Sequence, residues 1–397
     1  MTNRLFPTLG RRDLFASAAA AAASATAASL NTAEAKEMAK ESVRTMTVRG
    51  YNGIYPRMPT LKMETRGEFY AGLYKWRLQE MEKAADAHAM ELLRANGIDP
   101  MADMSWGEAV ALLEGDPLIA MTCRARSSHQ KLKYQMLQNE YYKRADEFLS
   151  EMERADKMGP GTLELNPKMD IPEYTAREIH SMPGGYVGDP FAGHLYHAGT
   201  DWGAYVEVNY QDGAHMQMAK AAATPADGKV KRILDLGTSI GQFATSMKRR
   251  FPDAEVWGLD IGGPMVRYAH MKAADMGVDV NFAQRLCEKS GFPDNHFDIV
   301  TSNLLFHEVN EQGAKDIIKE VARVLRPGGV YSSTDTNDTP PTAKGKYTLW
   351  YNYRWNHEDW YADWHRVDFK GEMEKNGLKV KRSVTGRFDP KYVAIKV

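Results

Sequence analysis

The sequence predicts an α/β protein in which a mainly parallel β-sheet follows a helical region. Three observations support this fold class. From Lys229 onward, short apolar runs alternate with helical stretches, which is the pattern of βαβ units. The apolar run at 232–236 ends in a glycine turn that leads into a helix, as expected for a parallel strand and its crossover. Upstream of residue 160, apolar residues recur every three or four positions instead, which is the spacing of one helix face.

Seven strands are expected in the sheet, with helices in most of the gaps between them. The strands are predicted at residues 232–236, 255–260, 278–283, 297–302, 329–334, 379–384 and 392–397. The last two strands are separated by a short turn, as in an antiparallel hairpin. We therefore expect the sheet to end with an antiparallel strand.

The region before the sheet is expected to form a mainly helical domain. Helical periodicity runs over 65–96 and stops at Gly97. Ser105 and Glu108 have the spacing of a capping box, which marks a second helix start. Charged, helix-favouring sequence then continues over 118–157.

The first 35 residues have the features of an export signal. Arg11 and Arg12 precede two apolar residues and an uncharged, alanine-rich stretch, and small residues at 33 and 35 fit a cleavage site before Lys36. This segment resembles a bacterial twin-arginine signal peptide. It implies the twin-arginine export machinery as a partner of the precursor and the periplasm as the destination. The alternatives are an uncleaved membrane anchor, or a cytoplasmic protein with an alanine-rich tail.

We divide the chain into a signal peptide at 1–35, a helical domain at 36–220 and an α/β domain at 225–397. Within the helical domain, residues 170–215 crowd glycine, histidine and aromatic side chains between short apolar pieces. Such irregular sequence is typical of a substrate loop, which makes Tyr186 and His197 candidate substrate-binding residues. An aromatic-packed connector between domains is the alternative.

Composition excludes several classes of protein. The 51 lysines and arginines nearly cancel the 52 aspartates and glutamates, so the overall charge does not favour a nucleic-acid partner. Aromatic residues at 10% indicate a packed globular protein. Cys123 and Cys287 are interpreted as two unlinked buried thiols. No Cys/His cluster has zinc-ligand spacing, so no metal is expected.

Four motifs resemble those of class I S-adenosylmethionine-dependent methyltransferases, type 11-like members in particular. The first is Leu-Asp-Leu-Gly-Thr-Ser-Ile-Gly at 234–241, and the others cover 292–300, 301–309 and 324–330. They occur in the order and spacing of the family. The resemblance implies a Rossmann-like sheet of seven strands with an antiparallel last strand. A nicotinamide-dependent oxidoreductase, the alternative enzyme class, would need G-x-G-x-x-G, which the turn lacks.

The resemblance also implies cofactor contacts at matching positions. Asp235 would lie near the ammonium of S-adenosylmethionine, and Asp260 would accept hydrogen bonds from its ribose. Ser239 replaces a frequent glycine, and Leu286 stands where many relatives place an aspartate for adenine. The complete implied set is Asp235, Gly237, Thr238, Ser239, Gly241, Asp260, Ile261, Cys287, Glu288, Asn303 and Leu304.

Methyl transfer from a sulfonium depends mainly on alignment of the two reactants, with a base needed only for some acceptors. His307 beyond the fourth strand and Asp335 after the fifth are the catalytic candidates, whereas Glu308 is interpreted as a helix-start acid or a surface residue. Aromatic walls suit a flat or cationic acceptor. The further substrate-binding candidates are Trp350, Tyr353, Trp355 and His357, unless this stretch is an amphipathic helix packed on the helical domain.

We therefore expect a methyltransferase that uses S-adenosylmethionine to methylate a small-molecule acceptor by in-line displacement. The helical domain is expected to cover the cofactor cleft. An exported, non-catalytic ligand-binding protein on the same fold is the main alternative, because the cofactor is made in the cytoplasm.

Overall fold

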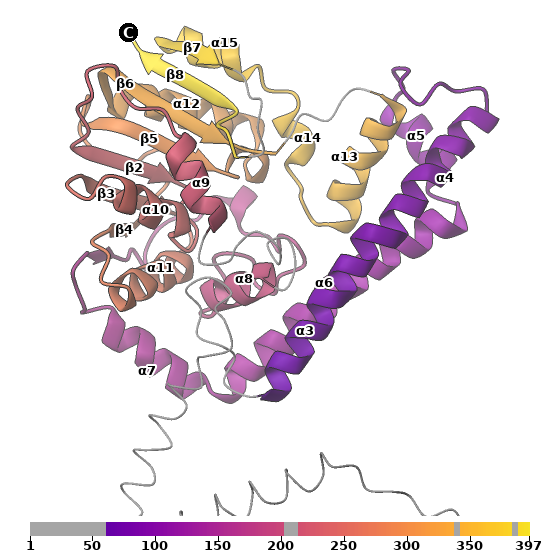
Figure 1. The fold of residues 1–397 in the computed structure, drawn as a ribbon, viewed down its shortest axis with the longest axis horizontal. Helices are drawn as coiled ribbons and strands as arrows, with labels where there is room; N and C mark the ends of the chain where they lie inside the picture. Colours follow the sequence, from indigo (N-terminus) through magenta and orange to yellow (C-terminus); the bar gives the residue numbers. More distant parts are fainter. Residues whose placement is uncertain (1–60, 202–212, 337–341, 383–387) are drawn as a thin grey trace, which may run out of the picture. The chain divides into compact units, whose positions relative to one another are not determined.

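The computed structural model describes residues 61–201, 213–336, 342–382 and 388–397 (Figure 1). The expected export signal at 1–35 lies outside the described residues. Residues 65–397 form one compact unit. The division of this unit near residue 220 therefore stays a prediction. No helix within the described ranges is long and apolar enough to cross a membrane.

The described residues contain an eight-stranded sheet, which confirms the predicted α/β fold (Figure 1). The strand order is β1-β4-β3-β2-β5-β6-β8-β7, and the pairs from β1 through β6 are parallel, whereas β8 is antiparallel to both of its neighbours. The bounds are β1 Leu163–Glu164, β2 Arg232–Leu236, β3 Glu255–Asp260, β4 Asn281–Gln284, β5 Phe297–Asn303, β6 Leu325–Thr334, β7 Leu378–Arg382 and β8 Tyr392–Lys396.

One strand was not expected. β1 adds Leu163 beside Phe282 at the β4 edge of the sheet. The Thr162 hydroxyl donates to the Asn281 side-chain oxygen at 2.7 Å and fixes this register. A strand of two residues is too short to show alternation in the sequence, which is why seven strands were expected.

Two helical layers cover the sheet, and the alternation of side chains along each strand decides which layer a residue meets. Ile233 packs with α9, α10 and α11. Its neighbour Leu234 packs with α12 and α15 on the opposite face. The bounds of these helices are α9 Gly213–Ala221, α10 Gln242–Arg250, α11 Gly263–Asp275, α12 Glu311–Val324 and α15 Phe369–Lys375. Because both faces are covered, the central strands β2 and β5 are buried along nearly their whole length.

The N-terminal part of the described chain is helical, as predicted. Its elements are α3 Leu61–Trp76, a π-helical turn η1 Arg77–Met81, α4 Glu82–Ala95, α5 Trp106–Leu113, α6 Pro117–Lys143 and α7 Ala145–Ala155. The expected capping box is present, since Ser105 caps α5 and Glu108 reaches back to the Ser105 backbone. Gly97 takes a positive φ of 74° just after α4, in agreement with the predicted helix end.

The aromatic stretch after β6 is helical and belongs to this helical region. Helix α13, Ala343–Trp355, packs against α5, and its Trp350 lies in an apolar cluster with Leu93, Leu113 and Ile119. Of the two interpretations of this aromatic stretch, the structure agrees with an amphipathic helix packed on the helical domain. The remaining elements are η2 Glu173–Thr175, α8 Ala192–Asp201, η4 Phe306–Glu308 and α14 Tyr361–Trp364. Both cysteines are buried and free, as expected.

Replacing Gly241 with alanine is expected to destabilise the protein more than the matched replacement of Gly228. Both glycines have positive φ, 78° and 69°, so an added Cβ carries a conformational penalty of about 1 kcal/mol at either site. At Gly241 the Cβ would also lie 2.6 Å from Phe282 Cζ and 2.9 Å from Ala269 Cβ, whereas nothing lies within 4 Å at Gly228. This crowding should remove a further 1–3 kcal/mol, roughly, from the free energy of unfolding. Urea denaturation measures both variants, and equal losses would contradict the crowding.

Candidate functional site

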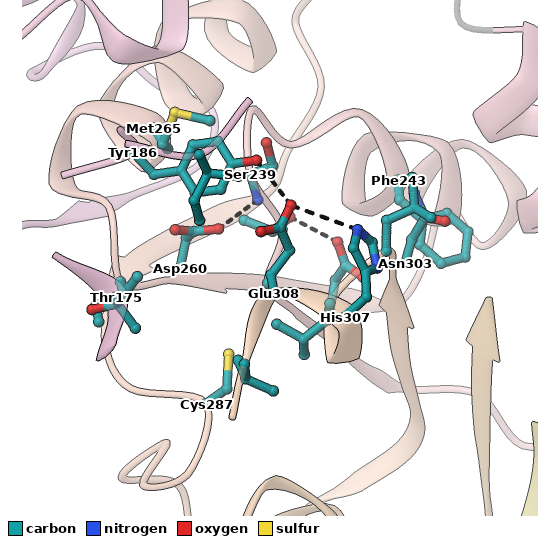
Figure 2. Close-up of a pocket in the computed structure, with 18 of the residues that line it drawn as sticks. Thr175, Tyr186, Ser239, Phe243, Asp260, Met265, Cys287, Asn303, His307 and Glu308 are labelled. Carbon is teal, nitrogen blue, oxygen red and sulfur yellow. Dashed lines mark hydrogen bonds and ion pairs between the residues drawn. The ribbon is translucent and has the colours of Figure 1, made fainter. Parts of the chain in front are cut away.

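A pocket lies where β2, β3 and β5 end, on the carboxyl side of the parallel strands. Ligands of open α/β sheets bind at this edge. Residues that follow these three strands line it together with residues of 174–215 (Figure 2). None of the described residues of α3 to α7 lines this pocket. The part of the predicted helical domain (36–220) that supplies this wall is its irregular segment, together with α8 and α9.

The Asp260 carboxylate connects the two loops that form the floor of the pocket. Its two oxygens accept from the backbone N–H groups of Ser239 and Gly262, each at 2.8 Å. Burial raises the pKa of Asp260 to about 6, although these hydrogen bonds favour the charged form. Ser239 has a φ of 53°, in the left-handed region that a small polar residue tolerates better than a branched one.

Asp235 is buried at the end of β2. Its oxygens accept from the hydroxyls of Thr301 at 2.8 Å and Thr238 at 2.7 Å. Burial raises the pKa of this carboxyl to about 7. Asp235 therefore holds the turn through its threonine partners, and it carries less charge at pH 7 than an exposed aspartate would.

Two polar atoms at the pocket have no hydrogen-bond partner among the described residues. They are Ser239 Oγ and Asn303 Oδ1, both inaccessible to solvent. A buried polar atom without a partner carries a desolvation penalty that a polar ligand can relieve. Together with the Asp260 carboxylate, these atoms fit a ligand that carries several hydroxyl and amino groups, as S-adenosylmethionine does.

His307 and Asp335 form a buried ion pair at the pocket. His307 Nδ1 lies 2.6 Å from Asp335 Oδ1, and the Asp335 side chain is 0% exposed. The second Asp335 oxygen accepts from the backbone N–H of Phe306 at 2.9 Å. Burial alone would lower the pKa of His307, but Asp335 outweighs it and raises the pKa to about 10. The two catalytic candidates are thus in direct contact, and the imidazole is protonated at neutral pH.

Glu308 extends this pair into a larger polar cluster. Its Oε1 accepts from the Tyr186 hydroxyl at 3.2 Å (Figure 2). The same oxygen lies 3.3 Å from His180 Nε2. His180 Nδ1 in turn lies 3.4 Å from Glu358 Oε1. Burial would raise the pKa of Glu308, but His180 and His307 lower it overall. Glu308 is only 14% exposed, so its interpretation as a surface residue is corrected, although it does lie in the first turn of the short helix η4.

The end of the pocket expected to hold adenine contains Cys287, Glu288 and Tyr174. The Tyr174 hydroxyl donates to Glu288 Oε1, and burial raises the pKa of the Cys287 thiol. Glu288 is thus held in place by a residue from the irregular segment.

Most of the predicted cofactor residues line the pocket. They are Asp235, Gly237, Thr238, Ser239, Asp260, Ile261, Cys287, Glu288, Asn303 and Leu304, and His307 and Tyr186 line it as well. Gly241 does not, because the space of its missing Cβ faces Phe282 and Ala269. Position 241 needs a glycine because φ is positive there and because α10 packs too closely on the sheet for a Cβ.

Five predicted substrate-binding residues lie elsewhere. His197 is buried and hydrogen-bonds the Tyr268 hydroxyl at 2.7 Å. Trp350 and Trp355 pack in the apolar cluster of the helical region, and Tyr353 is 48% exposed. His357 follows α13 and does not line the pocket.

Sequence reasoning missed His180, His215 and Glu308 as pocket residues. His180 and His215 belong to the histidine-rich irregular stretch, which was the available signal. Burial lowers the pKa of His215 to about 4, so this histidine is neutral.

Part of this chain is similar to a known protein family. Residues 233–329 match the family described as a methyltransferase domain. A demethylmenaquinone methyltransferase of Thermus thermophilus is 37% identical over 140 residues, which are 35% of this chain and 61% of that protein. A ubiquinone/menaquinone biosynthesis C-methyltransferase of Desulfotalea psychrophila is 36% identical over 30% of this chain and 46% of its own length.

Among solved structures, a putative methyltransferase of Bacillus halodurans is 23% identical over 42% of this chain and 70% of that chain, with a TM-score of 0.36. The chain spans between about half and three fifths of the length of the curated relatives named above, which are covered to 46% and 61%. The family match confirms the expected methyltransferase domain and supports S-adenosylmethionine as its cofactor. His180, Tyr186 and Glu358 lie outside the matched range.

Asp335→Asn is expected to lower the free energy of unfolding by about 3 kcal/mol at pH 7, because it removes the nearer counter-ion of the buried His307 imidazolium and leaves only Glu308, 3.6 Å away. The pKa of His307 is raised from 6.5 to about 10, so this stabilisation is fully present below pH 6.5 and is lost as the pH rises through 10. The difference between wild type and variant should therefore shrink from pH 7 to pH 10 in urea denaturation.

Asp294→Asn is the control for this prediction. Asp294 forms an ion pair with Arg323 but is 71% exposed, so its loss should change stability by less than about 1 kcal/mol. An Asp335→Asn effect that stays constant from pH 7 to pH 10 would contradict the ion pair.

Proposed function

We propose that this chain is a methyltransferase that transfers a methyl group from S-adenosylmethionine to a small-molecule acceptor. The observation that carries the proposal is the position of the pocket. Most of its lining residues lie within the range that matches a methyltransferase domain, around the glycine turn tied to Asp260. Ser239 Oγ and Asn303 Oδ1, which have no hydrogen-bond partner among the described residues, support a polar ligand in the same pocket.

Named residues can be assigned to parts of the cofactor. Asp260 would hold the ribose hydroxyls, and Ser239 and Asn303 would bond the polar groups of the methionine part. At Gly237, φ is 65° and an added Cβ would lie 2.7 Å from Leu305 Cδ1, so glycine keeps the turn close to the loop after β5. When bound, the cofactor supplies a methyl group that its sulfonium has already activated.

The chain's own contribution is to align the acceptor and exclude water. His307 is protonated at neutral pH, since its pKa is about 10, so it is poorly suited to remove a proton there. Its role in this proposal is to position η4, through the contacts of Asp335 with the His307 imidazole and with the Phe306 backbone. Asp335 is then a positioning residue as well.

The relatives suggest a first acceptor to test. The Thermus thermophilus relative is named for methylation of demethylmenaquinone. Incubation of the protein with reduced demethylmenaquinone and methyl-labelled S-adenosylmethionine, followed by mass spectrometry, tests whether this chain shares that acceptor. Absence of product would exclude this acceptor, whereas binding of the cofactor is tested separately.

Asp260→Asn is expected to weaken S-adenosylmethionine and S-adenosylhomocysteine to a similar extent, by about tenfold each, because both contain the ribose that Asp260 would bind. Isothermal titration calorimetry measures both affinities. Asp253→Asn is the control, because Asp253 is exposed and outside the pocket. If wild-type protein binds neither compound at millimolar concentration, the proposed function is wrong and a non-catalytic binding protein is favoured.

We also propose that the precursor is exported through the twin-arginine machinery and matures at Lys36. Twin-arginine transport carries folded proteins, so the cofactor could be bound before export. Fractionation and intact mass of the expressed protein test this proposal. Arg11→Lys combined with Arg12→Lys should retain the full-length chain in the cytoplasm, because the signal depends on the arginine pair. A wild-type chain that keeps Met1 in the cytoplasm would contradict export.

A further inference from the structure

The pocket carries an unbalanced negative charge. Four carboxylates line it, those of Asp235, Asp260, Glu288 and Glu308; among the described residues that line it there is no lysine or arginine, and the cationic candidates are the histidines His180 and His307. A low-dielectric pocket lined with one sign of charge attracts ligands of the opposite sign. The overall charge of the chain, −1, does not reveal this local excess.

The four carboxylates are not equivalent. Asp260 and Asp235 each use both oxygens for hydrogen bonds inside the protein. Burial raises the pKa of both groups, to about 6 and about 7, which weakens their charge near neutral pH. Glu308 differs, since His180 and His307 lower its pKa and keep the carboxylate ionised.

The position of Glu308 places its charge beside the loop after β5, where the resemblance to methyltransferases implies the sulfonium. Glu308 lies in η4, five residues after Asn303, which ends β5 and lines the pocket. Across the pocket it is close enough to Asp260 for its charge to raise the pKa of that carboxyl (Figure 2). Tyr186 and His180 hold its Oε1 from the side of the irregular segment.

The neighbouring histidines do not cancel this charge. Both histidines contact Glu308, but each is shared with a second carboxylate. His307 lies 2.6 Å from Asp335 and 3.6 Å from Glu308, and His180 lies 3.3 Å from Glu308 and 3.4 Å from Glu358. Two imidazolium groups therefore face three carboxylates, and one negative charge is left over when all five are ionised. Glu358 and Asp335 do not line the pocket, so Glu308 is the member of the cluster that presents this charge to a ligand.

We propose that Glu308 is the fixed counter-charge for the sulfonium of the bound cofactor, and that it makes the pocket select S-adenosylmethionine over the uncharged thioether product. This inference rests on the proposed function. It assigns to Glu308, with His180 and Tyr186 as its supports, a role in discriminating substrate from product. Two of these three residues lie outside the range that matches the methyltransferase domain.

The test compares affinities for the charged and the uncharged cofactor, so it does not require the acceptor. Isothermal titration calorimetry on the purified protein gives Kd for S-adenosylmethionine and S-adenosylhomocysteine. Glu308→Gln should lower the preference for S-adenosylmethionine over S-adenosylhomocysteine about tenfold, because only the sulfonium loses its counter-charge. Glu308→Asp keeps the charge and should retain most of that preference.

Glu358→Gln is the matched control. It removes a carboxylate from the same cluster, on the side of His180 that faces away from the pocket, and should change the preference by less than about threefold. Thermal unfolding checks that each variant is folded. If Glu308→Gln does not fold, Glu308→Ala removes the same charge without placing an amide N–H group opposite Tyr186 and His180.

The outcomes are distinct. A preference that falls in Glu308→Gln but not in Glu358→Gln supports the inference. An unchanged preference in Glu308→Gln, with both compounds still bound, overturns the inference and leaves the proposed function intact. An equal fall in both variants also overturns it, because the charge would then belong to the whole cluster. Failure of wild-type protein to bind either compound rejects the proposed function itself.

Discussion

The two hydrogen bonds of the Asp260 carboxylate are the constraint on which the pocket depends. They join the turn after β2 to the turn after β3, through the backbone N–H groups of Ser239 and Gly262. Helices α10 and α11 begin directly after these turns, so one carboxylate sets where both helices start. The left-handed conformation of Ser239 brings its N–H to Asp260 and leaves its hydroxyl without a partner among the described residues. The same interaction thus shapes the loops and prepares polar atoms for a ligand.

A second constraint comes from outside the matched domain. Tyr186 and His180 belong to the segment between α7 and α8, and Glu358 follows α13, yet all three meet at Glu308 or its histidine partner. A buried carboxylate is stable in its ionised form only with such hydrogen-bond donors and counter-ions. The irregular segment therefore does more than connect two regions, because it supplies the donors that keep the pocket charged.

Much of the fold could be predicted because its signals are local. The bounds of β2 and β3 agree with the predicted ranges, since buried parallel strands are short apolar runs that end in turn residues. The pocket residues that follow these strands were predicted for the same reason.

The features that were missed depend on contacts or lengths that leave no local signal. β1 was missed, because a strand of two residues shows no alternation of side chains. Trp350 and Trp355 were assigned to the acceptor, but aromatic residues on a helix are as well suited to packing, and only the fold shows that they face α4, α5 and α6. Glu308 was misread because its burial results from His180, more than a hundred positions away.

Charge conservation limits what Glu308 can do for the chemistry. When a neutral acceptor takes a methyl group from a sulfonium, the positive charge passes to the acceptor and remains there until a proton is lost. A negative charge near the reacting centre then stabilises the bound cofactor and the transition state to a similar degree. Interactions that are equal in both states strengthen binding without accelerating the chemical step. The charge of Glu308 therefore mainly strengthens cofactor binding and favours release of the uncharged product. The rate of the methyl-transfer step depends instead on how closely the rest of the pocket aligns the acceptor.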